Sequence, residues 1–258
     1  MPLPIPFYLF AFLFGAIVGS FLNVCICRLP EGKSVVYPPS ACPRCGYQIR
    51  WYDNIPMVSF LLLRAKCRSC STPISWRYPL VEALNGLLTL FLFMKFGVSL
   101  SFLALFLFCS SLVVITFIDL DHQIIPDEIS LPGIVIGFLF ALFLPWNGWL
   151  NSLLGILLGG GSLFLVAWGY EKLTGKEGMG GGDIKLLAMM GAFLGWRSVL
   201  FIIFAASLVG SVIGITAMLI QKKDGKLAIP FGPFLAFAAV LYIFYGRQII
   251  SWYLSIGR

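Results

Sequence analysis

The stretch "SLSFLALFLFCSSLVVITFIDL", residues 99–120, is an apolar run of membrane-spanning length that ends beside an acid, Asp119. Within lipid a single segment can satisfy its own backbone N–H and C=O groups only as a helix, and about 20 apolar residues cross the bilayer. The run therefore predicts a transmembrane helix. Asp121 follows two residues later, roughly 200° further round such a helix, so the two carboxylates cannot share one face.

The rest of the chain repeats this apolar character. Of its 258 residues 59% are hydrophobic and 11% are charged, whereas a soluble domain carries about 25% charged residues. We therefore predict an all-α polytopic membrane protein with eight transmembrane helices. The other seven predicted spans are 5–27, 79–95, 130–146, 148–171, 184–196, 198–220 and 229–246.

The predicted spans divide the chain into three regions. Residues 1–27 form a first transmembrane helix, 28–78 a polar lobe and 79–258 a transmembrane core. The first run has neither the basic start nor the small-residue cleavage site of a secretory signal, so we expect a retained helix.

Basic residues orient the eight spans. With the N-terminus outside, only Lys95, Arg197, Arg247 and Arg258 fall on one side, and the other Lys and Arg residues fall on the second side. The positive-inside rule places that second side, with the polar lobe, in the cytoplasm. The net charge of +7 then reflects orientation and contact with anionic lipid, and nothing favours nucleic acid as a partner.

The polar lobe contains two CxxC knuckles. Cys42 and Cys45 form the first, and Cys67 and Cys70 form the second. Paired knuckles at this separation are typical of a tetrahedral Cys₄ zinc site. Two disulfides are the alternative, which a reducing compartment disfavours. Because so small a lobe buries little core, we expect the zinc to be structural.

A second acid stands out in "GMGGGDIKL" (178–186), where Asp183 follows three consecutive glycines. In the eight-span topology, Asp119 and Asp183 both lie at cytoplasmic helix ends. Two facing carboxylates can share a proton, so that one activates a water and the other protonates a leaving amide. From the residues alone, the two acids could form an aspartyl dyad or a proton relay. A plain helix-capping role for Asp183 also stays open.

At these residues the chain resembles the bacterial type IV prepilin peptidase family, also called leader peptidase/N-methyltransferase. The resemblance covers nearly the whole chain. Its matching stretches are "GSFLNVCICRLP" (19–30), "CPRC", "DNIP" and "CRSC" (42–70), "ISWRYPLVEAL" (74–84), "IDLDHQIIPD" (118–127), "GMGGGDIKLLAMMGAFLGW" (178–196) and "IPFGPFLA" (229–236).

The resemblance implies a GxGD-type aspartic protease of the inner membrane that cleaves the basic leader of prepilins and pseudopilins, on the cytoplasmic face. It implies Asp119 and Asp183 as the catalytic pair. The residues expected to bind the substrate are Gly180, Gly181, Gly182, Asp121 and Asp127. The segment 119–128 carries four acids and no Lys or Arg, so it should attract a basic leader.

Many family members also methylate the new N-terminal residue with S-adenosylmethionine, an activity that the family associates with the first cytoplasmic lobe. The matching positions are Asp53, Asn54, Lys66 and Glu82, for which holding the lobe together is the alternative role. One position departs from the family pattern, because Ala65 stands where a glycine is expected. A proton-coupled transporter that uses the paired acids as a relay is the alternative to the whole assignment.

Overall fold

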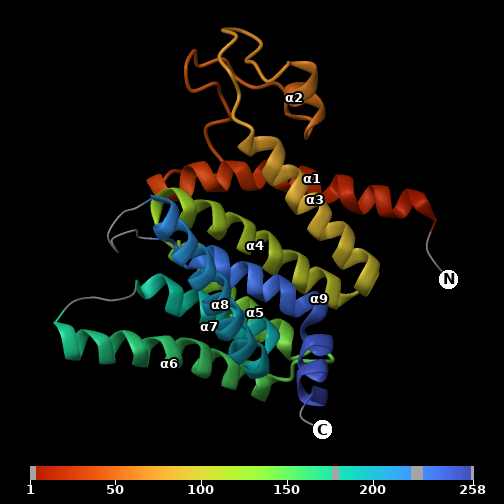
Figure 1. Cartoon of the computed structure of the whole chain (residues 1–258). Helices are drawn as coiled ribbons and strands as arrows, with labels where there is room; N and C mark the ends of the chain where they lie inside the picture. Colours follow the sequence, from red (N-terminus) through yellow and green to blue (C-terminus); the bar gives the residue numbers. More distant parts are fainter. Residues whose placement is uncertain (1–3, 176–179, 222–228, 257–258) are drawn as a thin grey trace. The chain divides into compact units, whose positions relative to one another are not determined.

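The computed structural model describes residues 4–175, 180–221 and 229–256, and this part of the chain is helical without a β-strand (Figure 1). Eight helices of 14 residues or more lie within it. They are α1 (Ile5–Arg28), α3 (Arg77–Phe96), α4 (Leu100–His122), α5 (Asp127–Ala141), α6 (Trp149–Thr174), α7 (Gly181–Leu194), α8 (Trp196–Gln221) and α9 (Gly232–Ile256). The lobe contributes α2 (Val58–Leu62) and the 3₁₀ turns η1 (Leu29–Glu31) and η2 (Trp51–Asn54).

Every predicted span coincides with one of these helices, so the prediction of an all-α polytopic membrane protein is confirmed. Six of the described helices are long and apolar enough to cross a membrane. The other two, α5 and α7, have only 15 and 14 residues, short of the roughly 17 that a span needs. The count of eight spans therefore stays a prediction.

The chain forms two compact units, Met1–Val114 and Ile115–Arg258, and the division falls within α4. In the first unit α1 and α3 lie side by side (Figure 1). Glycines permit this close approach: a Cβ at Gly15 would lie 2.6 Å from Cβ of Thr89, and one at Gly19 would lie 2.8 Å from Cα of Glu82. Small residues that let backbones approach are typical of helix packing in membranes.

Buried asparagines add hydrogen bonds between the helices of the first unit. Asn85 on α3 donates to the backbone oxygen of Gly15 at 2.7 Å and accepts a bond from Ser110 on α4 at 3.0 Å. Asn23 on α1 donates to the backbone oxygen of Tyr78 at 3.1 Å. These bonds satisfy polar groups that would be costly to leave unpaired away from water.

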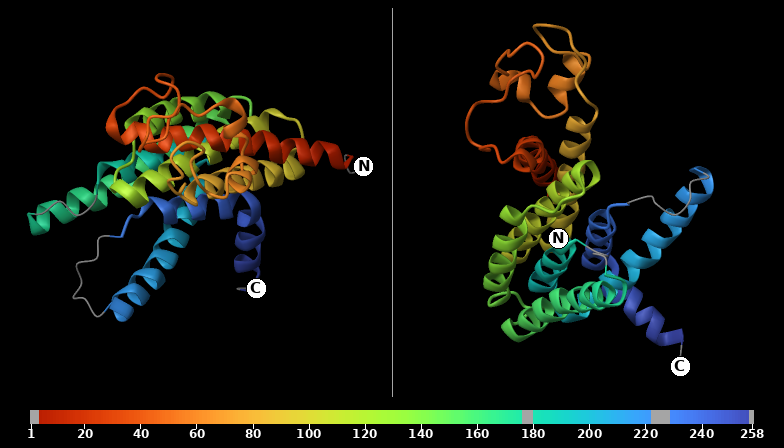
Figure 2. Two further views of the ribbon diagram at one scale, coloured as in Figure 1. Left: turned by 90° about the horizontal axis from the view of Figure 1, so that it is seen from above. Right: turned by 90° about the vertical axis from the view of Figure 1, so that its left-hand side faces the viewer.

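In the second unit α6 and α7 also pack through glycines, and both views in Figure 2 show them next to each other. A Cβ at Gly191 would lie 2.1 Å from the backbone oxygen of Gly155, and a Cβ at Gly159 would lie 2.5 Å from that of Leu187. Ser152 on α6 donates to the backbone oxygen of Ala192 at 2.8 Å. This packing fixes the helix whose first turn carries Asp183.

The lobe belongs to the same compact unit as α1 and α3. The predicted boundary at residue 79, between the lobe and the transmembrane core, does not separate the two compact units. It is a division by function, and it stays a prediction.

Candidate functional site

Asp119 lies one turn before the end of α4, and only 5% of its surface is exposed. The backbone N–H of Gly232, the first residue of α9, donates a hydrogen bond to its Oδ2 at 2.9 Å. A Cβ at Gly232 would lie 2.6 Å from that same oxygen, so a glycine is needed for this contact. The backbone N–H that fixes the Asp119 carboxylate thus comes from a segment 113 positions away, at the start of α9.

Asp183 is the third residue of α7 and is partly buried. The helix has Gly180 as its N-cap and makes no side-chain capping bond, so the simple capping role does not describe Asp183. Its carboxyl group interacts electrostatically with that of Asp119. The structure therefore brings the two predicted acids together within the second unit.

The three glycines before Asp183 have different surroundings. A Cβ at Gly182 would lie 2.9 Å from Cβ of Ile125, so this glycine is needed for packing within the chain. A Cβ at Gly180 or Gly181 would meet no described atom within 4 Å. Only these two glycines leave the backbone before Asp183 open to a substrate. Gly178, at the start of the same motif, lies outside the described residues.

The two acids expected to bind substrate lie on either side of the α4–α5 turn. Asp121 is exposed near the end of α4, and Asp127 is the first residue of α5. The Asp127 carboxylate accepts two hydrogen bonds from Nζ of Lys185, at 2.7 and 2.8 Å. This ion pair connects the start of α5 to the first turns of α7, two residues after Asp183.

The four lobe cysteines converge on one point, as the spacing predicts. Their Sγ atoms all lie within 4.8 Å of one another, with 3.8 Å between Cys42 and Cys70 and 4.0 Å between Cys45 and Cys67. A zinc ion bound at about 2.3 Å to four sulfurs in a tetrahedron separates them by about 3.8 Å. The residues present therefore fit a tetrahedral metal site.

The two knuckles have the same pattern of backbone hydrogen bonds. In each, the N–H of the first cysteine donates to an oxygen five residues later, Tyr47 or Thr72, at 2.9 and 2.8 Å. Hydrogen bonds with Thr72 lower the pKa of the Cys70 thiol to about 6. The thiolate is the form that binds metal, so this environment favours metal binding by Cys70, whereas the pKa of Cys45 is raised to about 11 beside the other sulfurs.

The four positions matched to methylation have different contacts. Asp53 forms a two-pronged ion pair with Arg68, whose Nε lies 3.0 Å from both carboxylate oxygens. Because Arg68 lies between the cysteines of the second knuckle, this pair serves the structure of the lobe. Lys66 is exposed where the second knuckle begins, and its backbone forms an isolated bridge with Pro73.

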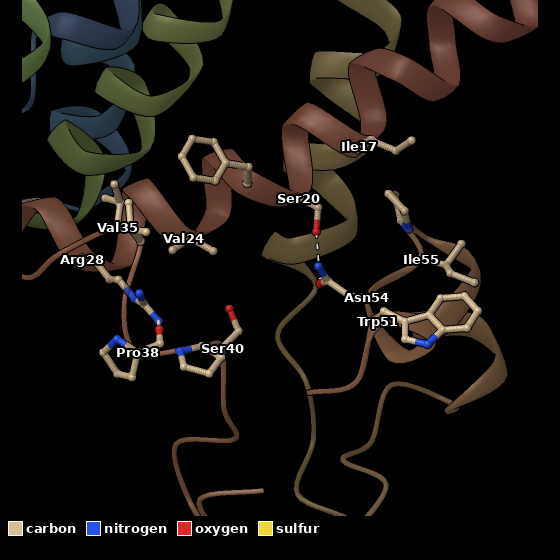
Figure 3. Close-up of a pocket in the computed structure, with 14 residues that line it drawn as sticks. Ile17, Ser20, Val24, Arg28, Val35, Pro38, Ser40, Trp51, Asn54 and Ile55 are labelled. Carbon is tan, nitrogen blue, oxygen red and sulfur yellow. Dashed lines mark hydrogen bonds between the residues drawn. The ribbon is translucent and has the colours of Figure 1, made fainter. Parts of the chain in front are cut away.

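Asn54 and Glu82, by contrast, both interact with Ser20 of α1. Ser20 on α1 donates to Oδ1 of Asn54 at 3.2 Å (Figure 3). Glu82 is buried, accepts a bond from the backbone N–H of Met57 at 2.8 Å, and also interacts with Ser20. Sequence reasoning missed Ser20 and Gly232 as site residues, although both lie inside the matched stretches 19–30 and 229–236.

Comparisons with known proteins point to one family over nearly the whole chain. The bacterial peptidase A24 N-terminal domain matches residues 13–96, and the type IV leader peptidase family matches residues 106–215. A prepilin leader peptidase/N-methyltransferase of Stutzerimonas stutzeri is 39% identical, over 99% of this chain and 96% of the relative. Its namesake in Pseudomonas aeruginosa is 40% identical, over 98% and 95%.

A further relative with the same name, from Aeromonas hydrophila, is 39% identical over 98% of this chain and 96% of its own length. No solved structure gives a significant match. Identity of this degree over nearly the full length of both chains shows common descent, and so the chain belongs to the type IV leader peptidase family.

Proposed function

We propose that this chain removes the basic leader of type IV prepilins or pseudopilins, with Asp119 and Asp183 as its catalytic pair, and then methylates the new N-terminal residue. One observation carries the peptidase assignment. Two acids 64 positions apart, on different helices, interact within one site, and one of them is held by the start of a third helix. The family and the names of the relatives support the same activity.

The proposed chemistry is that of an aspartic pair. One carboxylate removes a proton from a water molecule, whose oxygen attacks the scissile carbonyl carbon. The other carboxyl group donates its proton to the leaving nitrogen as the C–N bond breaks. The Gly232 N–H orients Asp119 for this work, because it fixes Oδ2 at 2.9 Å. The comparisons do not support the alternative of a proton-coupled transporter.

Substrate recognition rests on charge and backbone access. Asp121 and Asp127 present negative charge beside the pair and attract the basic leader. Gly180 and Gly181 admit the backbone of the substrate, while Gly182 maintains the packing against Ile125.

Zinc, when bound by Cys42, Cys45, Cys67 and Cys70, supplies folding energy to the lobe rather than reaction chemistry. The methyl donor is S-adenosylmethionine. Among the four matched positions, the contacts of Asn54 and Glu82 fit a role in methylation best, and Asp53 and Lys66 contribute through the structure of the lobe.

The protein lies in the bacterial inner membrane with its N-terminus outside and with the lobe and the acid pair at the cytoplasmic face. The distribution of Lys and Arg supports this orientation. Four of the lysines that contribute to it, Lys176, Lys222, Lys223 and Lys226, lie outside the described residues.

Purified protein, a prepilin and S-adenosylmethionine test both activities in one reaction, with mass spectrometry to follow leader loss and methyl gain separately. Asp119→Asn and Asp183→Asn should each abolish leader loss, whereas Glu171→Gln, at an exposed acid near the end of α6, should retain it. Full cleavage by either well-folded Asn variant would exclude the pair.

A further inference from the structure

The cavity where the lobe meets α1 has no role in leader cleavage as derived above. Its volume is about 550 Å³, which lies within the range of small-molecule sites. Its floor is one face of α1, where Ile17, Ser20, Val24 and Arg28 recur at intervals of three or four residues (Figure 3). Eleven residues of helix rise roughly 16 Å, so the floor accommodates an elongated molecule.

The two ends of the cavity differ in chemistry. At one end the Arg28 guanidinium donates to the backbone oxygens of Ser34 and Pro38, at 3.0 and 2.7 Å. These bonds use two of its five N–H groups and hold it in place, which suits it to bind a carboxylate. At the other end lies Trp51, whose side chain is largely exposed although it lines the cavity.

Polar groups also occupy the middle of the floor. Ser20 and Asn54 are hydrogen-bonded to each other there, and both line the cavity. The buried carboxyl group of Glu82 does not line the cavity but interacts with Ser20. A cationic centre in the middle of a bound molecule would therefore lie near the buried acid Glu82.

We propose that this cavity binds S-adenosylmethionine, with its carboxylate on Arg28, its sulfonium near Ser20 and Asn54, and its adenine against Trp51. The inference rests on the proposed methylation. The order of groups along the floor matches the order in the molecule: an anion, a central cation and a flat aromatic ring. Aromatic side chains bind nucleobases by stacking, and they attract cations as well.

The methyl transfer balances without a further reagent. The neutral N-terminal amine of the cleaved pilin uses its lone pair to form the new N–C bond. The C–S bond breaks, and its electron pair remains on sulfur, which becomes a neutral thioether. The resulting secondary ammonium releases its proton to solvent.

A lipid acyl chain is a competing occupant, since much of the lining is apolar. An acyl chain would offer no anion to Arg28 and no polar group to Ser20 and Asn54, so we favour the nucleoside. The test below separates the two.

The test is binding of radiolabelled S-adenosylmethionine to the full-length protein in detergent, measured alongside methylation and cleavage of a prepilin. Trp51→Ala should weaken binding about 5-fold to 150-fold, the usual range for loss of one stacking contact. Arg28→Met should weaken it as well, and Trp51→Phe should largely restore it. Trp76→Ala is the matched control, because Trp76 is similarly exposed in the same unit but does not line the cavity.

Ultraviolet cross-linking adds a readout that does not depend on the variants. The label should enter the peptide that contains residues 51–56, and excess unlabelled S-adenosylmethionine should prevent it. Normal binding and methylation by Trp51→Ala and Arg28→Met, with cross-links elsewhere, would overturn the cavity assignment and leave the methyltransferase standing. A wild-type protein that cleaves but neither binds nor methylates would overturn both, and lipid recovered from the cavity would then identify the competing occupant.

Discussion

The backbone N–H of Gly232 donates a hydrogen bond to Oδ2 of Asp119 at 2.9 Å, across 113 positions of sequence. The contact connects the first residue of α9 to the buried acid of α4. It also explains why the residue is glycine, since a Cβ there would lie 2.6 Å from the same oxygen. The start of α9 is therefore part of the wall of the acid site.

Gly232→Ala should impair leader cleavage through this contact. The added methyl group displaces either the Asp119 carboxylate or the first turn of α9, and a shift of about 1 Å in a reacting group can cost roughly 10²-fold in rate. We expect kcat to fall by about that factor, with KM for the prepilin nearly unchanged.

Gly169→Ala provides the control for this prediction. A Cβ at Gly169 of α6 would meet no described atom within 4 Å, and alanine favours a helix over glycine. This variant should cleave at the wild-type rate. A Gly232→Ala protein with wild-type kcat would show that the hydrogen bond is not needed for catalysis.

Asp127→Asn should weaken substrate binding while leaving the fold intact. Its ion pair with Lys185 is exposed, and such pairs contribute only about 0–1 kcal/mol to stability. The basic leader loses an attractive charge, so KM should rise several-fold at low salt, and kcat should change little. The difference should shrink at high ionic strength, because salt screens exposed charges.

Glu171→Gln, at an exposed acid near the end of α6, controls for the loss of one negative charge elsewhere. Equal changes in KM for the two variants would mean that overall charge, rather than Asp127, attracts the leader.

Gly191→Leu should destabilise the second unit and inactivate the peptidase. At this position α7 approaches α6 so closely that even a Cβ would collide with the backbone oxygen of Gly155. Separating the two helices would move Asp183, which lies two turns earlier on α7. We expect a lower melting temperature together with lost cleavage, whereas Gly161→Leu, where a Cβ meets no described atom, should retain both properties.

Removal of zinc should unfold the lobe before the helices. Wild-type protein should contain one zinc per chain by elemental analysis, and Cys42→Ser with Cys45→Ser should contain none, because a structural site needs its four ligands. Protease cleavage within 28–78 should then accelerate. Cys27→Ser, at an exposed cysteine outside the cluster, should keep its metal, and wild-type protein without zinc would contradict the assignment.

Much of this architecture could be predicted from the sequence because apolar length and cysteine spacing act locally. The eight apolar runs match the long helices, and the paired knuckles bring their sulfurs together. The pairing of Asp119 with Asp183 could be predicted only from the topology and the family resemblance, because no residue near either acid in the sequence identifies its partner.

Other contacts could not be predicted, because they depend on how distant helices approach. The bond from Gly232 to Asp119 requires α9 to begin beside α4, and the Lys185–Asp127 ion pair requires α5 and α7 to start together. The exposed position of Trp51 beside a cavity likewise follows from how the lobe rests on α1. The hydropathy of a segment predicts that it forms a helix, but it does not identify the helices against which that segment packs.

The backbone conformation at Ala65 suggests why the family pattern has a glycine at this position. Its φ is 58°, in the left-handed region that glycine adopts freely and that costs another residue about 1–2 kcal/mol. The preceding residue, Arg64, is also left-handed, with φ of 52°. A glycine would suit the tight turn that leads into the second knuckle, so we predict that its absence here affects stability rather than methyl transfer.

Ala65→Gly should accordingly stabilise the zinc-loaded lobe. Relief of the left-handed conformation is worth about 1–2 kcal/mol, and the greater freedom of glycine in the unfolded chain offsets part of it. We expect the protease-resistance midpoint of the lobe to rise in temperature while the rates of cleavage and methylation stay the same. Ala41→Gly, at a lobe alanine without a positive φ, should lower that midpoint, since glycine there only adds freedom to the unfolded state. A gain in methylation by Ala65→Gly without a gain in stability would instead place Ala65 in the methyl-transfer machinery.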